Sequence, residues 1–164
     1  MPIENLGPAE RFAAGALGQP GSRRFFLEVT TGGTIHSFPC EKSQVAELAS
    51  QGLQLLLLAG LHPDHHAVEH LVATGLQITD PEEPRFRIGS IGVAVDASEL
   101  LSITFGSIEE DESATFVVSP EQFRAMALVA VEVVAAGRPI CPRCQLPEDP
   151  EGHRCPSVNG HHGS

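Results

Sequence analysis

The sequence predicts an α+β protein built from two similar halves, each an antiparallel β-meander followed by a helix, with a C-terminal zinc knuckle. Three observations carry this prediction. Arg11-Phe-Ala-Ala-Gly-Ala-Leu-Gly18 recurs as Arg85-Phe-Arg-Ile-Gly-Ser-Ile-Gly92, each copy precedes strand-like segments and a serine-initiated helix, and three cysteines cluster near the C-terminus. Such an internal repeat usually means one supersecondary unit used twice, so we expect a pseudo-twofold axis between the halves. The expected parts are a first half (8–61), a connector (62–84), a second half (85–137) and a tail (138–164).

The first half should form a hairpin and then a helix. Phe25–Thr30 is β-prone, Gly32-Gly33 suits a two-residue turn that needs positive φ, and Thr34–Cys40 is the return strand. Apolar residues then follow the 3.6-residue period over Ser43–Leu61, which predicts an amphipathic helix. Gly52 is a weak point on the apolar face of this helix, because glycine lowers helix propensity.

The connector between the halves is rich in histidine and acidic residues. If it is helical, His62, His66 and His70 share one face, and the last two have the i,i+4 spacing of a two-histidine metal grip. The glutamate next to His70 is misplaced for an H-E-x-x-H motif. Histidines this dense on a polar connector are typical of a solvated surface, and a metal site there is the alternative.

Alternating apolar residues predict three strands in the second half, around Ile91–Val95, Leu101–Phe105 and Thr115–Val118. The acidic run Glu109–Glu112 separates the last two strands and indicates a solvated hairpin tip.

The second half ends in a predicted helix with strong start signals. Ser119-Pro-Glu-Gln122 supplies an N-cap, a proline at the first helical position and a capping-box glutamine. Between Ala125 and Ala136 the helix carries one charge, Glu132, so we expect it at the centre of the fold, packed on a sheet and on the first helix, or across an oligomer interface. Gly137 is placed to end it.

The tail carries the clearest chemistry of the chain. Cys141-Pro-Arg-Cys144 and His153-Arg-Cys155 put three thiols and an imidazole within fifteen residues, the ligand types of a structural zinc site. The tail has few large apolar residues, and zinc binding supplies roughly 10 kcal/mol or more to fold such segments. Our predicted ligands are Cys141, Cys144, His153 and Cys155, with His161 or His162 as a replacement for His153. A redox-active Cys-x-x-Cys and a metal-free tail are the alternatives. Cys40 is expected to be an inert, partly buried thiol.

Composition limits the function classes. The formal charge of −11, from 10 basic and 21 acidic residues, argues against binding to nucleic acid or to an anionic membrane. No signal peptide or membrane-spanning run is visible, so we expect a cytoplasmic protein whose partner is another protein, a second copy of the chain or a small molecule.

No nucleophile–base motif is recognisable, so the leading function is a non-catalytic adaptor or protein-interaction module with a structural Cys3His zinc site. The alternative is a hydrolase or transferase with a small-ligand site in the groove between the halves. Its candidate groups are Arg11, Arg85, Asp96 and Glu41, although the arginines could equally bond strand-end carbonyls or a carboxylate.

The chain resembles an uncharacterised family found mainly in actinobacteria, labelled domain of unknown function 3090. The resemblance spans nearly the whole chain and rests on Glu10–Gly15, Gly18–Leu27, Glu41–Ala46, Phe86–Gly89, Ala135–Pro139, Cys141-Pro-x-Cys144, Asp149–Pro156 and Asn159-Gly160. The family has no established activity. The resemblance therefore supports the architecture and the zinc site and implies no role.

Overall fold

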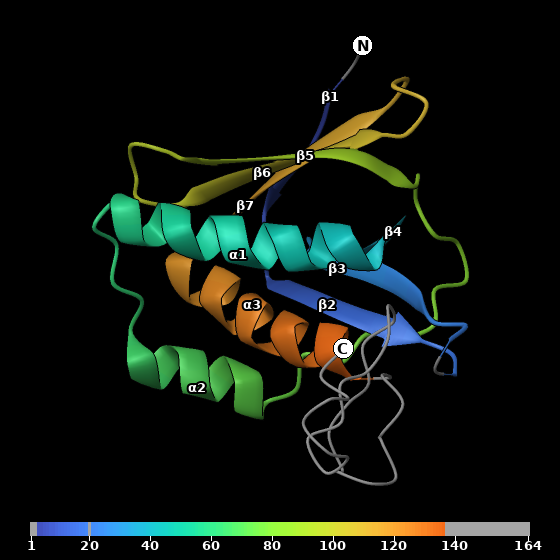
Figure 1. The fold of residues 1–164 in the computed structure, drawn as a ribbon. Helices are drawn as coiled ribbons and strands as arrows, with labels where there is room; N and C mark the ends of the chain where they lie inside the picture. The colour runs from blue at the N-terminus through green and yellow to red at the C-terminus, as the bar shows by residue number, and fades with distance from the viewer. Residues whose placement is uncertain (1–2, 20, 137–164) are drawn as a thin grey trace, which may run out of the picture.

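The computed structural model describes residues 3–19 and 21–136. Within these residues the chain forms an α+β fold with two β-sheets and three helices (Figure 1). Sheet A has the strand order β1-β7-β6-β5 and sheet B the order β2-β3-β4. The elements are β1 (Ile3–Pro8), β2 (Arg11–Leu17), β3 (Arg24–Thr31), β4 (Thr34–Cys40), α1 (Lys42–Leu58), α2 (His65–Ala73), β5 (Ile88–Val95), β6 (Leu101–Ser107), β7 (Ser113–Val118) and α3 (Pro120–Ala135).

The two predicted meander-plus-helix segments are present as β2-β3-β4-α1 and β5-β6-β7-α3, with antiparallel pairing throughout each meander. Local signals predict one turn and one helix start correctly, but α1 is capped by Glu41 and not by Ser43, and it ends at Leu58 and not at Leu61. Gly32 and Gly33, at φ of 55° and 79°, form the predicted turn between β3 and β4. Ser119 accepts a hydrogen bond from the Gln122 amide, and the Gln122 side chain accepts one from the Ser119 amide, so the predicted capping box starts α3.

Strand β1 was not expected from the sequence, and it joins the two sheets. It pairs in parallel with β7. The chain then passes through Ala9, whose amide donates to the Val117 carbonyl, and Glu10, whose amide donates to the Thr30 carbonyl, before entering β2. One nearly continuous segment therefore belongs first to sheet A and then to sheet B.

The connector is also more ordered than expected, because it contains helix α2 and part of the core. The Asp64 side chain accepts a hydrogen bond from the Ala67 amide and caps α2, which packs on α3. Val68 and Leu76 are buried together with Ala13 and Ala125. Residues 62–84 therefore bridge the two meanders and cover part of the helical layer.

A row of phenylalanine rings joins the facing sides of the two sheets. Ring centroids of successive members lie 5.1 to 6.4 Å apart, mostly in the edge-to-face arrangement that aromatic pairs prefer. The row runs Phe123, Phe12, Phe116, Phe105, Phe38, Phe86. Helices α1 and α3 lie side by side in Figure 1, α1 next to β5 and α3 against β2, and they close one side of this core.

Helix α3 occupies the predicted central position on one face. It packs against both α1 and β2. Phe123, Met126, Ala127 and Ala130 are buried on its inner face. Its outer face stays open, since Val131 is 59% exposed.

Candidate functional site

The predicted zinc ligands Cys141, Cys144, His153 and Cys155 lie outside the described residues, as do the alternatives His161 and His162 and the predicted helix end at Gly137. Across residues 3–19 and 21–136, no three histidine, cysteine, aspartate or glutamate side chains are grouped so that they could hold a metal ion.

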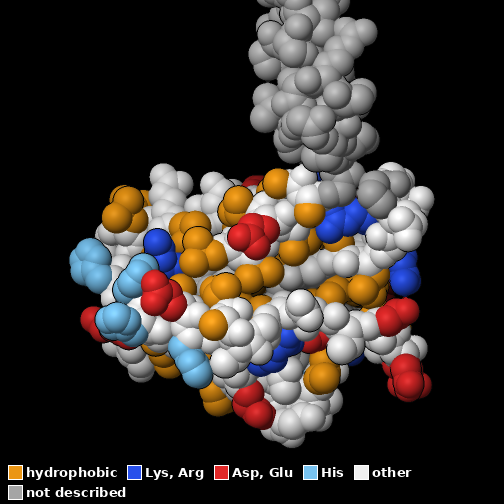
Figure 2. Space-filling view, turned by 90° about the horizontal axis from the view of Figure 1, so that it is seen from below, with side chains coloured by type: hydrophobic (Ala, Val, Ile, Leu, Met, Phe, Trp, Pro, Cys, Tyr) orange, Lys and Arg blue, Asp and Glu red, His pale blue; other side chains and the backbone are white. Residues whose placement is uncertain are grey.

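The histidines of the connector lie on the surface around α2. Figure 2 shows them gathered at one end of the molecule. His62, His66 and His70 are exposed, and His65 pairs with Glu69 at 2.9 Å. Their exposure agrees with the solvated-surface interpretation.

Arg11 lies on the face of sheet B that is turned away from the phenylalanine row. Its Nη1 donates to Oε1 of Glu28 at 2.6 Å, and its Nη2 donates to the Gln77 carbonyl. The Glu28 carboxylate is buried, with a side-chain exposure of 2%, and also accepts a hydrogen bond from the Thr79 amide at 3.3 Å. Arg11 therefore neutralises a buried acid and fastens the connector to the sheet.

Arg85 lies at the opposite face of sheet B. It donates to Nδ1 of His36 at 3.0 Å and to the Glu4 carboxylate. His36 pairs in register with Val29 of the main core, whereas Arg11 and Glu28 point the other way. Burial and then the Arg85 charge lower the pKa of His36 below 6.5, and Glu4 opposes them. The predicted groove that holds both arginines is therefore not formed.

The two acids predicted for that groove are also engaged elsewhere. Oδ1 of Asp96 accepts hydrogen bonds from the amides of Ser98 and Leu100, at 2.8 and 3.0 Å, and so shapes the turn after β5. Glu41 pairs with Arg87 at 3.2 Å near the start of α1. Each candidate of the enzyme hypothesis has a local structural role, as the sequence allowed for the arginines.

Cys40 is a buried thiol at the end of β4. Its exposure is 4%, and burial raises its pKa to about 12. A thiol with this pKa holds almost no thiolate at neutral pH, so Cys40 is an inert core residue as predicted.

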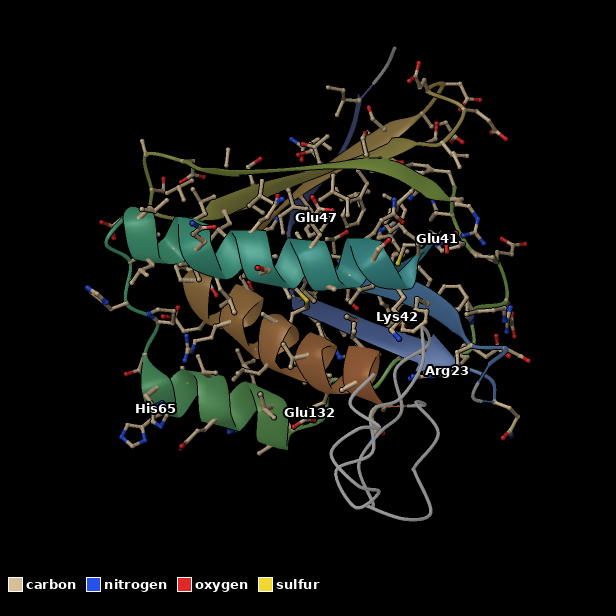
Figure 3. The ribbon with its side chains drawn as sticks, in the orientation of Figure 1. Arg23, Glu41, Lys42, Glu47, His65 and Glu132 are labelled. Carbon is tan, nitrogen blue, oxygen red and sulfur yellow. The ribbon has the colours of Figure 1, made fainter. Side chains whose placement is uncertain are left out.

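A groove of about 430 Å³ does lie between elements of the two halves, between α1 and β5. One wall is a helix face and the other is a strand. Figure 3 labels Glu47, the charged residue of the helix wall. The lining residues are Gln44, Glu47, Leu48, Gln51 and Leu55 of α1 and Gly89, Ser90, Ile91 and Val93 of β5.

The strand wall of this groove is a free sheet edge. β5 is the last strand of sheet A, with β6 on its inner side. The Ile88 carbonyl receives a hydrogen bond from Nε2 of Gln44 at 3.0 Å, and no described residue pairs with the outer edge beyond it. Edge strands are usually protected by a proline or by charged side chains. The regular part of this edge, Ser90–Val95, contains neither.

The other edge strands carry features that β5 lacks. Helix α3 packs along β2. In β4, Pro39 lacks an amide donor and the Ser37 carbonyl accepts a hydrogen bond from the Arg85 amide. β1 has a register shift between Asn5 and Gly7. The sequence did not reveal the groove, because α1 and β5 are far apart in the chain; the unprotected edge sequence was its one local signal.

A family model described as Protein of unknown function (DUF3090) matches residues 5–155. No curated protein and no solved structure matches this chain. None of the helices in the described ranges is long and apolar enough to cross a membrane.

Proposed function

This chain belongs to the DUF3090 family of proteins of unknown function, and we propose that it is a non-catalytic, zinc-stabilised protein-binding module. In this proposal the groove between α1 and β5 receives an extended segment of a partner protein, which adds a strand to sheet A. The observation that carries it is the free edge of β5 facing a helix across a groove of about 430 Å³. A free edge offers unpaired amides and carbonyls, and strand addition satisfies them with main-chain hydrogen bonds.

The side chains around the edge indicate the chemistry of the partner segment. Leu48, Leu55, Ile91 and Val93 give the groove apolar contacts for alternate side chains of an added strand. Glu47 is the charged residue among the lining residues. Its Oε1 accepts a hydrogen bond from Nε2 of Gln51 at 2.8 Å. A basic side chain in the partner would complement it. Because each copy of this chain carries a formal charge of −11, pairing of two β5 edges is disfavoured relative to a basic partner.

A comparison of peptide affinity between two matched variants tests the groove. Full-length protein is used to select peptides from a random display library, and the selected peptides are then measured against Glu47→Lys and Glu132→Lys. Figure 3 shows that Glu132 lies on α3, away from the groove, so the second variant makes the same charge reversal at a neutral site. We expect basic peptides with alternating apolar residues, and a loss of about tenfold in affinity for Glu47→Lys alone, equal to about 1.4 kcal/mol.

Hydrogen exchange supplies the independent readout. A bound strand should slow exchange of the outward-facing amides within residues 90–95, which lack partners among the described residues. Protection at another surface, equal loss in both variants, or a library that yields no specific peptide would refute the groove as the binding site.

The second part of the proposal is a structural zinc ion held by Cys141, Cys144, His153 and Cys155. The donor set supports it, because three thiols and one imidazole complete the four ligands of a closed zinc site. When bound, the metal supplies a cross-link for a segment with few apolar residues. His161 and His162 remain the alternatives to His153.

Thiol counting tests the zinc site on the intact protein. The chain has four cysteines, and Cys40 is buried with a pKa of about 12. We expect one zinc per chain by native mass spectrometry, slow reaction of all four thiols, three reactive thiols after chelation and four after denaturation. His153→Ala should lower the zinc affinity, whereas His161→Ala should not. Protein that retains no zinc, or that pairs these cysteines as a disulfide, would refute this part.

The proposal also includes an origin of the two halves by duplication. The repeated motif begins β2 at Arg11, and its second copy, which begins at Arg85, runs into β5. The shared order of three antiparallel strands and a helix supports a common origin. A crystal structure in which the two segments superpose poorly would contradict it.

A further inference from the structure

A second hollow, of about 220 Å³, concentrates positive charge in a chain that is strongly acidic overall. It lies where β3 begins and β4 leads into α1. Arg23, Arg24 and Arg87 line it, and Glu41 is the one acid among its described lining residues. Figure 3 shows Arg23, Glu41 and Lys42 at the same end of the molecule, where α1 begins and α3 ends.

Each arginine is oriented by neighbouring groups and keeps further donors. Arg23 donates through Nη1 to the carbonyls of Val133, at 3.0 Å, and Ala136, at the end of α3. Its guanidinium lies 5.2 Å from the centroid of the Phe25 ring. A guanidinium has five N–H donors, and the hydrogen bonds of Arg23 to described residues use only Nη1.

The other two arginines are held at the surface by exposed ion pairs. Arg24 lies 3.6 Å from Asp80 and stacks over the Phe26 ring at 5.6 Å. Arg87 lies 3.2 Å from Glu41, and both of these side chains are largely exposed. Exposed pairs of this kind contribute little to stability, so they leave the two guanidinium groups able to engage a stronger anion.

We propose that this arginine-lined hollow binds a small phosphate or phosphomonoester dianion. Three planar guanidinium groups offer the paired N–H donors that match phosphate oxygens. The hollow also adjoins the first turn of the 17-residue helix α1, because Cys40 and Glu41 line it. The Glu41 side chain already caps this helix start, so the arginines alone would hold the anion. This site is separate from the α1–β5 groove, so either proposal can fail while the other stands.

Titration with inorganic phosphate tests the site on the full-length protein. At low ionic strength we expect saturable one-to-one binding by calorimetry, with acetate binding more weakly because it is a monoanion. Arg24→Gln and Arg87→Gln should each weaken phosphate binding by about tenfold, because each removes a charge-assisted hydrogen bond. Both side chains are exposed or half exposed, so these variants should fold.

Arg124→Gln is the matched control. Arg124 is exposed on α3, its side chain forms no ion pair or hydrogen bond with another described residue, and it does not line the hollow. Removing it lowers the positive charge of the protein by the same amount, so phosphate affinity should be unchanged. No saturation up to about 10 mM phosphate, equal binding of acetate, or an equal loss in Arg124→Gln would overturn the proposal.

Discussion

Replacing Gly52 by alanine tests the closest approach between α1 and α3. A Cβ atom at Gly52 would lie 1.9 Å from Cζ of Phe123, where ordinary van der Waals contact begins at 3.4 Å. The Phe123 ring cannot move outward, because it is fully buried and lies against Phe12 in the phenylalanine row. The added methyl group must therefore separate the two helices or displace the ring.

Two effects of opposite sign determine how far Gly52→Ala changes the free energy of unfolding. Alanine is favoured over glycine inside a helix by about 1 kcal/mol. Overpacking of a tight core costs about 1–3 kcal/mol, and the overlap at Gly52 places this variant near the upper end. We expect the free energy of unfolding to fall by about 2 kcal/mol, measured by urea denaturation followed by far-UV circular dichroism.

Two controls separate the gain in helix propensity from the cost of overpacking. Gln54 is exposed on the same helix, so the difference between Gln54→Gly and Gln54→Ala measures the propensity alone. In a Phe123→Leu background, the Gly52→Ala change should cost at least about 1 kcal/mol less, because the shorter side chain leaves room. A stabilised Gly52→Ala protein, or the same cost in both backgrounds, would show that the two helices do not meet as described.

Two further predictions concern the buried charges. The pKa of His36 is lowered by burial and by Arg85, so the unfolded chain binds more protons near pH 6.5 and this contribution to stability is lost as the pH falls below 6.5. The stability advantage of the wild type over His36→Asn should therefore shrink from about pH 7 to about pH 5 in denaturation experiments, and parallel pH profiles would contradict the shift. Arg11→Met leaves the buried Glu28 carboxylate without its ion pair and should cost about 3 kcal/mol. Adding Glu28→Gln should recover part of that loss, and a cost below about 1 kcal/mol would mean that water reaches Glu28.

The features that could be predicted from the sequence are those with local causes. The turn at Gly32-Gly33 needs positive φ at two successive residues, and the start of α3 needs side chains three residues apart. The inert character of Cys40 also followed from its place on an apolar strand. For the predicted site, the assignment of the connector histidines to the surface agrees with the structure, and the zinc ligands stay a prediction.

The features that could not be predicted depend on segments that meet only in the folded chain. Strand β1 pairs with β7, more than a hundred residues later, and nothing in Ile3–Pro8 signals that partner. Arg11 and Arg85 look equivalent in the repeated motif, yet they face opposite sides of sheet B because their carboxylate partners lie there.

The amino-acid sequence alone determined the strands and the helix of each meander segment, the capped start of α3 and the family, because these depend on neighbouring residues and on their chemical type. Tertiary structure alone decided which edge of the sheets stays open, which residues line the α1–β5 groove and where the arginines gather. Side-chain periodicity specifies which face of an element is buried but not which other element covers it. That choice is made by packing the phenylalanine row and the two central helices into one core.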